Sequence, residues 1–300
     1  MSRLEVNFLN RILKNPILTA SGTFGYGIEF QKYMDVSRLG GIISKGLTLN
    51  PKDGNTGIRI HETASGIMNS IGLQNPGVEH FIDHELPIMR KLNDYVISNL
   101  GGNSLSEYKE GAKMLDQTEV DAIELNISCP NVKEGGMAFG IVCEDARLVT
   151  SEVRKITTKP LIVKMSPNAY ELVRMACELE EAGADALSLV NTFNALAIDV
   201  EKRKPIFDNI TAGLSGPAIK PIALRMVREV ARAVSIPVIG IGGIMSAKDA
   251  LEFIMAGATL VELGTLNLIN PSGAIDVIDG IDDYMNRHGI DDLSEIRGII

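Results

Sequence analysis

The chain has 300 residues, 45% hydrophobic and 22% charged, which is enough to bury a large core without help from metals or disulfides. Its formal net charge of −9, with no basic run, argues against nucleic-acid binding, because such proteins usually gather Lys and Arg on one face. No stretch has signal-peptide character or the roughly 18 apolar residues of a membrane span, so we expect a cytoplasmic protein without a membrane partner.

Eight short apolar runs, rich in β-branched residues, follow one another along the chain. They are PILTAS from Pro16, GIISKG from Gly41, YVISN from Tyr95, AIELNIS from Ala122, PLIVKMS from Pro160, ALSLVNT from Ala186, PVIGIGG from Pro237 and LVELGT from Leu260. Each run predicts a parallel strand buried on both faces. Amphipathic helical patterns accompany several of them, at 106–117, 171–183, 218–234 and 246–257.

Eight βα units in series predict an α/β fold, a single (β/α)₈ TIM barrel domain over residues 1–300. A doubly wound sheet is the competing architecture, but its first Gly-rich turn typically follows strand one. Here the glycines gather after the seventh and eighth runs, where barrels usually bind phosphate. Two long gaps, 47–94 and 193–216, predict structured insertions over the C-terminal mouth of the barrel.

Polar residues end most of the predicted strands, and in a barrel these side chains face the active-site mouth. They are Ser21, Lys45, Asn99, Asn126, Ser128, Lys164, Asn191 and Thr192. Lysines and amides without a carboxylate among them favour an anionic, hydrogen-bonding ligand over a divalent metal. The alternative for any one of these residues is that it merely solvates a strand end.

Three glycine-containing turns predict a phosphate site, because exposed backbone N–H groups at the start of a helix bind anions. The turns contain Gly216, the pair Gly242 and Gly243, and the pair Gly264 and Thr265. They do not distinguish the phosphate of a cofactor from that of a phosphorylated substrate, and simple turn glycines remain the alternative.

Cys129 stands at the head of a predicted mouth loop, in the segment ELNISCPNVKEGGMAFG at 124–140, and Pro130 keeps it out of helical geometry. It is either a buried filler or a base tuned by nearby lysines and amides, and its loop position favours the base. Cys143 is less well placed, and Cys177 is expected in the core. With three cysteines and no CxxC pair, no disulfide framework or iron–sulfur ligand set is expected.

His80 and His84 form an i, i+4 pair in GVEHFIDHE. The pair is a possible metal site, but no third ligand or HExxH pattern accompanies it, so we expect a solvated helix face.

Several motifs together resemble the class 1 dihydroorotate dehydrogenases: NISCPNVKEGG, the strand-end Lys45, MNSIGLQNPG, VNT and the GG and GT turns. The likeness runs from Ala20 to about Asn270. The continuation NVKEGGMAFG and the turn GLSGPAIKP resemble the B-type, NAD-linked catalytic subunit rather than the A-type.

The resemblance implies that FMN lies across the barrel mouth, one per chain, and that dihydroorotate is oxidised to orotate in de novo pyrimidine (UMP) biosynthesis. The implied cofactor-binding residues are Ser21, Lys45, Gly46, Asn99, Asn126, Lys164 and Val190, with Gly216, Gly242, Gly243, Gly264 and Thr265 at the phosphate. The implied substrate-binding residues are Lys45, Asn69, Ser70, Ile71, Gly72, Leu73, Asn126, Asn131, Asn191 and Thr192.

The implied chemistry divides between two catalytic residues and the flavin. Cys129 removes a proton as general base, the hydride goes to flavin N5, and Lys164 stabilises the negative charge of the reduced flavin. B-type enzymes pass the electrons to NAD⁺ through a partner subunit that carries FAD and an iron–sulfur cluster. The implied assembly is a heterotetramer of two catalytic and two partner chains, with a homodimer core.

Three places depart from the B-type pattern: Thr23, the segment 101–103 from Gly101 to Asn103, and the segment 141–143 from Ile141 to Cys143. None is an implied catalytic residue.

Three alternatives stay open at this point. A dihydropyrimidine dehydrogenase-like barrel would use FMN and a loop cysteine to act on uracil or thymine. A lyase or isomerase with a phosphorylated substrate would use Lys164 without flavin. A non-catalytic flavin- or phosphate-binding module would leave the strand-end cysteine and amides idle.

Overall fold

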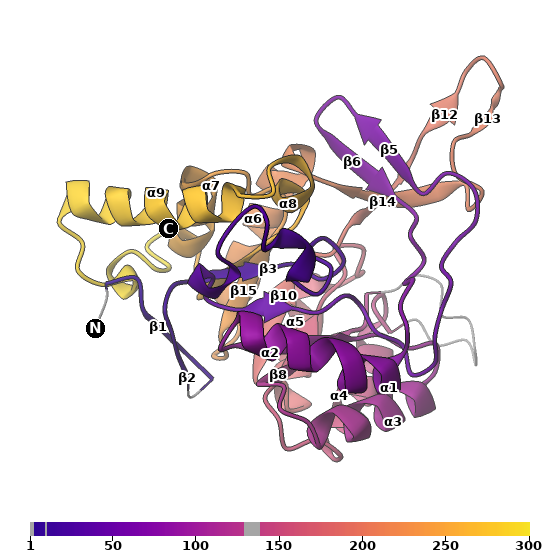
Figure 1. Ribbon diagram of the computed structural model, residues 1–300, viewed down its shortest axis with the longest axis horizontal. Helices are drawn as coiled ribbons and strands as arrows, with labels where there is room; N and C mark the ends of the chain where they lie inside the picture. Colours follow the sequence, from indigo (N-terminus) through magenta and orange to yellow (C-terminus); the bar gives the residue numbers. More distant parts are fainter. Residues whose placement is uncertain (1–2, 10, 129–138) are drawn as a thin grey trace.

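A computed structural model shows a closed barrel of eight parallel strands (Figure 1). The structure describes residues 3–9, 11–128 and 139–300. The barrel strands are β3 (Ile17–Thr19), β4 (Ile42–Ile43), β7 (Val96–Leu100), β8 (Ala122–Asn126), β9 (Leu161–Lys164), β10 (Ala186–Leu189), β15 (Val238–Ile241) and β16 (Leu260–Leu263). All eight predicted strands are confirmed, and so is the (β/α)₈ class.

The strands run in the order β3-β16-β15-β10-β9-β8-β7-β4, and a parallel bridge between Leu18 and Gly41 joins the first to the last. Every residue of β7, β8 and β9 is buried. Burial on both faces explains why the runs are apolar throughout rather than alternating.

Helices pack around the outside of the barrel. They are α1 (Val78–His80), α2 (Leu86–Leu92), α3 (Leu105–Asp116), α4 (Cys143–Arg154), α5 (Leu172–Glu181), α6 (Lys220–Ala231), α7 (Ala247–Met255), α8 (Thr265–Ile269) and α9 (Gly273–His288). Short helical turns occur at Ile28–Phe30, Val36–Arg38, Phe81–Glu85, Pro217–Ile219 and Leu293–Glu295. The four predicted helical patterns correspond to α3, α5, α6 and α7. Ser104 and Ser246 begin α3 and α7 by accepting backbone hydrogen bonds from Glu107 and Asp249.

The two long gaps form one antiparallel sheet that projects from the barrel (Figure 1). It contains β5 (Ile60–Thr63) and β6 (Gly66–Asn69) from the first gap, and β11 (Phe193–Leu196) and β14 (Thr211–Ser215) from the second. β6 pairs with β14, and Asn69 lies opposite Gly213. A short ribbon of β12 (Ile198–Asp199) and β13 (Lys204–Pro205) extends it. We expected structured insertions here, but not that the two would pair.

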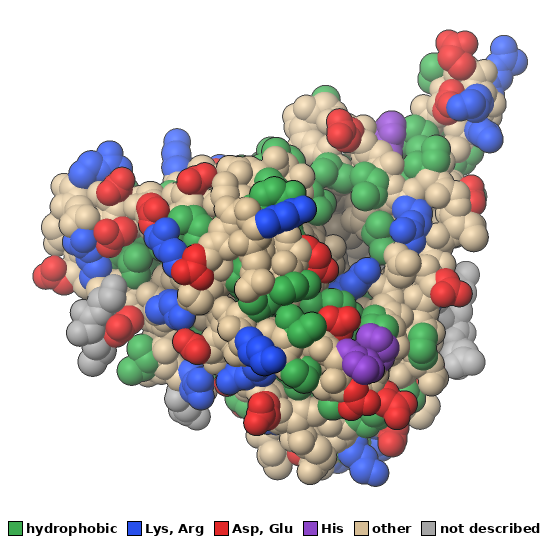
Figure 2. Space-filling view, viewed as in Figure 1, with side chains coloured by type: hydrophobic (Ala, Val, Ile, Leu, Met, Phe, Trp, Pro, Cys, Tyr) green, Lys and Arg blue, Asp and Glu red, His purple; other side chains and the backbone are tan. Residues whose placement is uncertain are grey.

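The surface is hollowed beneath this projecting sheet, with Lys and Arg side chains near the hollow (Figure 2). The N-terminal part of the chain forms an antiparallel hairpin of β1 (Val6–Phe8) and β2 (Arg11–Leu13). Within the described residues, no helix is both long and apolar enough to cross a membrane.

Candidate active site

The amide side chains at the ends of β7 and β8 are hydrogen-bonded to each other. Asn126 Nδ2 donates to Asn99 Oδ1 at 3.2 Å, and Asn99 Nδ2 donates to Glu124 Oε2. The Tyr108 hydroxyl donates to the backbone oxygen of Asn126 at 2.8 Å and so ties α3 to the end of β8. Asn99 and Asn126 are buried, so these contacts fix the orientation of both amides.

The network continues across the barrel mouth to β10. Ser128 Oγ donates to Asn126 Oδ1 at 2.6 Å, and Asn191 Nδ2 donates to Ser128 Oγ. Asn191 Oδ1 in turn accepts from the backbone N–H of Thr192 at 2.7 Å. The structure therefore brings Asn99, Asn126, Ser128, Asn191 and Thr192 together, as the strand-end argument expected.

Lys164 lies buried between two carboxyl groups. Its Nζ donates to Glu262 Oε2 at 3.0 Å and lies 3.6 Å from Glu124 Oε2. It also lies within 3.4 Å of Ser21 Oγ at the end of β3. Burial by itself lowers the pKa of Lys164, but the two carboxyl groups outweigh it and raise that pKa above its ordinary value. Lys164 is therefore held as an ammonium.

Glu124 and Glu262 correct the expectation that the site lacks carboxylates. Both side chains are fully buried inside the barrel, and neither was among the strand-end residues. Glu124 lies two residues before Asn126 and so faces the same side of β8. A Glu inside an otherwise apolar run was the signal that could have revealed them, because a charge is rarely buried without a partner.

Lys45 follows β4 and is half-buried. Burial, followed by the charge of Arg59, lowers its pKa below the ordinary lysine value, with Glu29 opposing. Its ammonium makes no hydrogen bond with any residue in the described ranges. The next residue, Gly46, lies against the site: a Cβ there would be 3.1 Å from Asn99 Oδ1 and 3.0 Å from a methyl of Leu73.

The segment from Asn69 to Leu73 leaves the projecting sheet in a tight turn. Asn69 Nδ2 lies 3.5 Å from the backbone oxygen of Gly213, and Ser70 Oγ accepts from Asn55 at 3.0 Å. Gly72 has φ of +76°, and a Cβ there would lie 2.5 Å from Asn55 Oδ1. The backbone oxygen of Ile71 accepts a hydrogen bond from the backbone N–H of Asn55 at 3.0 Å. Thr192 is adjacent to this sheet, because a Cβ on Gly213 would meet its hydroxyl.

The predicted phosphate turns converge. Gly243 has φ of +72°, and a Cβ there would lie 2.7 Å from the backbone oxygen of Gly216. Gly216, with φ of +95°, is in turn next to the Thr265 side chain. Gly242 has φ of +129°, and its added Cβ would lie 3.4 Å from Val190. Gly264 begins α8 immediately before Thr265. Turns after three different strands thus meet at one place, where bare backbone lets N–H groups approach an anion.

Comparison with known proteins agrees with this arrangement. The sequence pattern of the dihydroorotate dehydrogenase family matches residues 3–285. A dihydroorotate dehydrogenase B (NAD(+)) catalytic subunit from Petrotoga mobilis is 59% identical over 296 residues, which is 99% of each chain. Proteins of the same name from Thermoanaerobacter pseudethanolicus and Porphyromonas gingivalis are 55% and 50% identical, over 98% and 99% of this chain and 98% of each relative. The chain belongs to the dihydroorotate dehydrogenase family.

The cysteine that the family resemblance singles out, Cys129, lies outside the described residues, as does Asn131. The preceding residue, Ser128, is described and belongs to the amide network. Cys143 is buried at the start of α4, where burial raises the pKa of its thiol. Cys177 was expected in the core but is only partly buried, with its thiol 3.7 Å from the backbone oxygen of Ala233.

The places where this chain departs from the B-type pattern have local partners. Thr23 Oγ1 donates to the Ala20 backbone at 2.9 Å. Asn103 donates to Glu107 at the start of α3, from its backbone at 2.7 Å and its side chain at 3.0 Å. Ile141 accepts a backbone hydrogen bond from Tyr170 at 3.3 Å.

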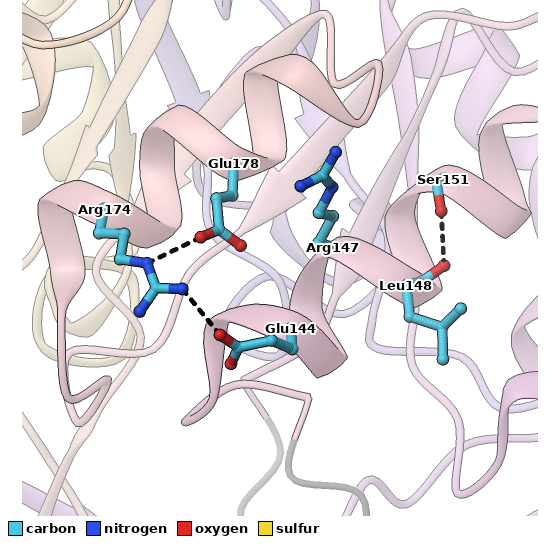
Figure 3. Close-up of a pocket in the computed structure, with 6 residues that line it drawn as sticks. All are labelled: Glu144, Arg147, Leu148, Ser151, Arg174 and Glu178. Atoms are coloured by element: carbon cyan, nitrogen blue, oxygen red, sulfur yellow. Dashed lines mark hydrogen bonds and ion pairs between the residues drawn. The ribbon is translucent and has the colours of Figure 1, made fainter.

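A pocket of about 450 Å³ lies on the outside of the barrel, between α4 and α5 (Figure 3). Arg174 bridges the carboxylates of Glu144 and Glu178 there, both at about 2.7–2.8 Å. The residues that line this pocket are none of those at the barrel mouth. The His80 and His84 rings, 4.4 Å apart, are exposed on another surface face, as predicted for a solvated helix.

Proposed function

We propose that this chain is the catalytic subunit of an NAD⁺-linked dihydroorotate dehydrogenase, which oxidises (S)-dihydroorotate to orotate in de novo pyrimidine biosynthesis. The observation that carries the proposal is one barrel mouth in which converging phosphate turns lie beside an amide network and a buried ammonium. The family membership and the names of relatives that are 50–59% identical support it.

FMN is the cofactor that we propose for this mouth, because the residues present fit it. The converging glycines suit its phosphate, and Lys164 offers a fixed positive charge beside Ser21. When bound, FMN would accept the hydride that the substrate loses. The residues proposed to hold it are Ser21, Lys45, Gly46, Asn99, Asn126, Lys164 and Val190, with Gly216, Gly242, Gly243, Gly264 and Thr265 at the phosphate.

The residues proposed to bind the substrate surround the same mouth. Dihydroorotate alternates ring N–H and C=O groups, which amides match without adding charge. Lys45 and backbone N–H groups of the segment from Asn69 to Leu73 would receive its carboxylate. The amides of Asn126, Asn131 and Asn191, with Thr192, would meet the ring.

Two residues are proposed to act in the chemical step. Cys129 takes the proton from the carbon next to the ring carbonyl, as a general base. Lys164 would stabilise the negative charge that FMN acquires on accepting the hydride, and its raised pKa keeps it charged for this task.

A partner subunit completes the proposed enzyme. It would carry FAD and an iron–sulfur cluster, and would pass electrons from this chain to NAD⁺ in the cytoplasm. We propose a heterotetramer built on a homodimer of this chain, with residues 1–300 forming a single FMN-binding domain.

Anaerobic mixing of the purified protein with dihydroorotate tests the proposal. We expect a yellow protein whose flavin bleaches with dihydroorotate and not with dihydrouracil. Bleaching with dihydrouracil alone would point to a dihydropyrimidine dehydrogenase-like enzyme. A colourless protein that takes up no FMN would favour a lyase or isomerase, and retained flavin that no dihydropyrimidine reduces would favour a binding module.

A further inference from the structure

Glu262 is a buried carboxyl group with one unsatisfied oxygen. Its side chain has no exposed surface, and it lies in β16 inside the barrel. Oε2 accepts a hydrogen bond from Lys164 Nζ at 3.0 Å, whereas Oε1 has no partner within the described part of the chain. A buried carboxylate oxygen without a donor is costly, so this atom requires an explanation.

The neighbouring carboxyl group, Glu124, is fully supplied with donors. Its Oε1 accepts from Ser188 Oγ at 2.6 Å, and its Oε2 accepts from Asn99 Nδ2 and faces Lys164. Glu124 therefore has the surroundings of an anion. Lys164 Nζ lies 3.0 Å from Glu262 Oε2 and 3.6 Å from Glu124 Oε2, so the two carboxyl groups flank one ammonium and are neighbours. Two ionised carboxylates at such a place repel each other, whereas a protonated carboxyl group can donate a hydrogen bond to an ionised one.

We propose that Glu262 carries a proton at neutral pH and acts as a positioning residue for Lys164. Its Oε1 donates to the ionised Glu124, and its Oε2 accepts from the Lys164 ammonium. This assignment supplies the missing partner of Oε1 and leaves one positive and one negative charge in the group. Burial, followed by the charge of Glu124, raises the pKa of Glu262 well above its usual range, in agreement with this assignment.

Within the eight barrel strands, all of which the structure describes, no further charged side chain competes for this proton. Strands β3, β4, β7, β10 and β15 contain no charged residue. Glu262, Lys164 and Glu124 are the charged residues of the remaining three strands. The titratable groups that face Glu262 from the barrel strands are therefore Lys164 and Glu124.

The consequence for catalysis rests on the proposed function, whereas the proton itself does not. If Glu262 were ionised, the group would carry a net negative charge beneath the mouth and would oppose charge arriving on a reduced cofactor. With Glu262 protonated, the Lys164 ammonium near Ser21 is offset only by Glu124.

Isotope-edited infrared spectroscopy of the full chain tests the proton directly. Glutamate labelled with ¹³C in the side-chain carboxyl separates its bands from those of flavin and backbone. We expect a label-sensitive band of a protonated carboxyl group at neutral pH, because exposed glutamates are ionised there. The band should vanish in Glu262→Gln and remain in Glu181→Gln, a matched change at an exposed glutamate. Absence of the band from the parent protein, or its survival in Glu262→Gln, overturns the proposal.

Urea unfolding decides which carboxyl group holds the proton. A raised folded-state pKa means that Glu262 stabilises the fold fully below its ordinary pKa of 4.5, and that this contribution is lost as pH rises toward and through the folded value. Gln mimics the protonated acid but cannot ionise, so the unfolding midpoint of Glu262→Gln should rise relative to the parent as pH increases.

Glu124→Gln should unfold at lower urea than Glu262→Gln throughout, because Gln cannot serve as the anion that Asn99 and Ser188 both contact. Equal midpoints for the two variants would overturn the assignment to Glu262. Neither the infrared nor the unfolding measurement requires turnover, so failure of dihydroorotate oxidation would count against the proposed function and leave this result standing.

A rescue experiment separates positioning from packing. In Glu262→Gln, dihydroorotate should reduce the bound flavin at close to the parent's rate at neutral pH. In Glu262→Leu, which has no polar atom for Lys164, flavin reduction should be at least about tenfold slower. Equal rates for the Gln and Leu variants would overturn the positioning role.

Discussion

The backbones of Gly243 and Gly216 approach so closely that a Cβ on Gly243 would lie 2.7 Å from the carbonyl oxygen of Gly216. The first residue follows β15 and the second precedes α6. Their contact joins two of the turns that we propose to bind the FMN phosphate. A side chain at Gly243 would push these turns apart.

Gly243→Ala should therefore lower the affinity for FMN by at least about tenfold, which corresponds to about 1.4 kcal/mol. Titration of FMN into the flavin-free protein measures this. Gly289→Ala is the matched control, since Gly289 has a similar φ of +64° at the end of α9 but no atom within 4 Å of an added Cβ. An equal loss of FMN affinity in both variants would mean that backbone strain alone, and not disruption of the phosphate turn, weakens FMN binding.

The lowered pKa of Lys45 leads us to expect that orotate binding depends on pH. Only the protonated amine attracts a carboxylate, and burial lowers its pKa in the free protein. Orotate affinity should be full below that pKa and should fall as pH rises through it, earlier than for an exposed lysine. Lys45→Ala should weaken binding by about 1.5–3 kcal/mol at neutral pH, the usual worth of a charged hydrogen bond.

Lys45→Arg provides the control for this prediction, because arginine keeps its charge across the alkaline range. Titrations of orotate at several pH values should show a fall for the parent and a flat profile for Lys45→Arg. The same fall in both proteins would assign the pH dependence to another group.

Cys129→Ser tests the proposed base. The variant should bind FMN and orotate, but its flavin should be reduced about 10²–10⁴-fold more slowly near neutral pH, and the rate should recover partly as pH rises, because an alcohol is a poor base. Anaerobic stopped-flow mixing with dihydroorotate measures the rate. Cys177→Ser, at a partly buried thiol on α5, is the control and should behave as the parent. Reduction of Cys129→Ser at the parent's rate near neutrality would show that Cys129 is not the base.

Lys164→Ala should destabilise the fold as well as abolish flavin reduction. Removing one member of a buried ion pair costs about 3–5 kcal/mol, because Glu124 would then be left without its cation. Urea unfolding at neutral pH measures the change, with the exposed Lys155→Ala as the control that should be nearly unaffected. If the free energy of unfolding fell no further in Lys164→Ala than in Lys155→Ala, the result would argue against a charged, buried Lys164.

The barrel could be predicted because its strands are buried on both faces, so each appears in the sequence as a continuous apolar run between turn residues. The projecting sheet could not. β5 and β6 are half-exposed, and β6 pairs with β14, from which four strands of the barrel separate it in the chain. No local pattern encodes so distant a pairing.

By itself, the sequence determined the eight strands, the polar residues that end them, the glycines of the phosphate turns and the family resemblance, because each depends on residues close together in the chain. Only the tertiary structure decided what those residues contact. Lys164 and Glu262 are 98 residues apart and meet because barrel closure points both side chains to the interior. Two buried carboxyl groups, Glu124 and Glu262, therefore lie beside the Lys164 ammonium, which is why we propose that Glu262 is protonated. The sequence of any one strand contains only one of these three residues.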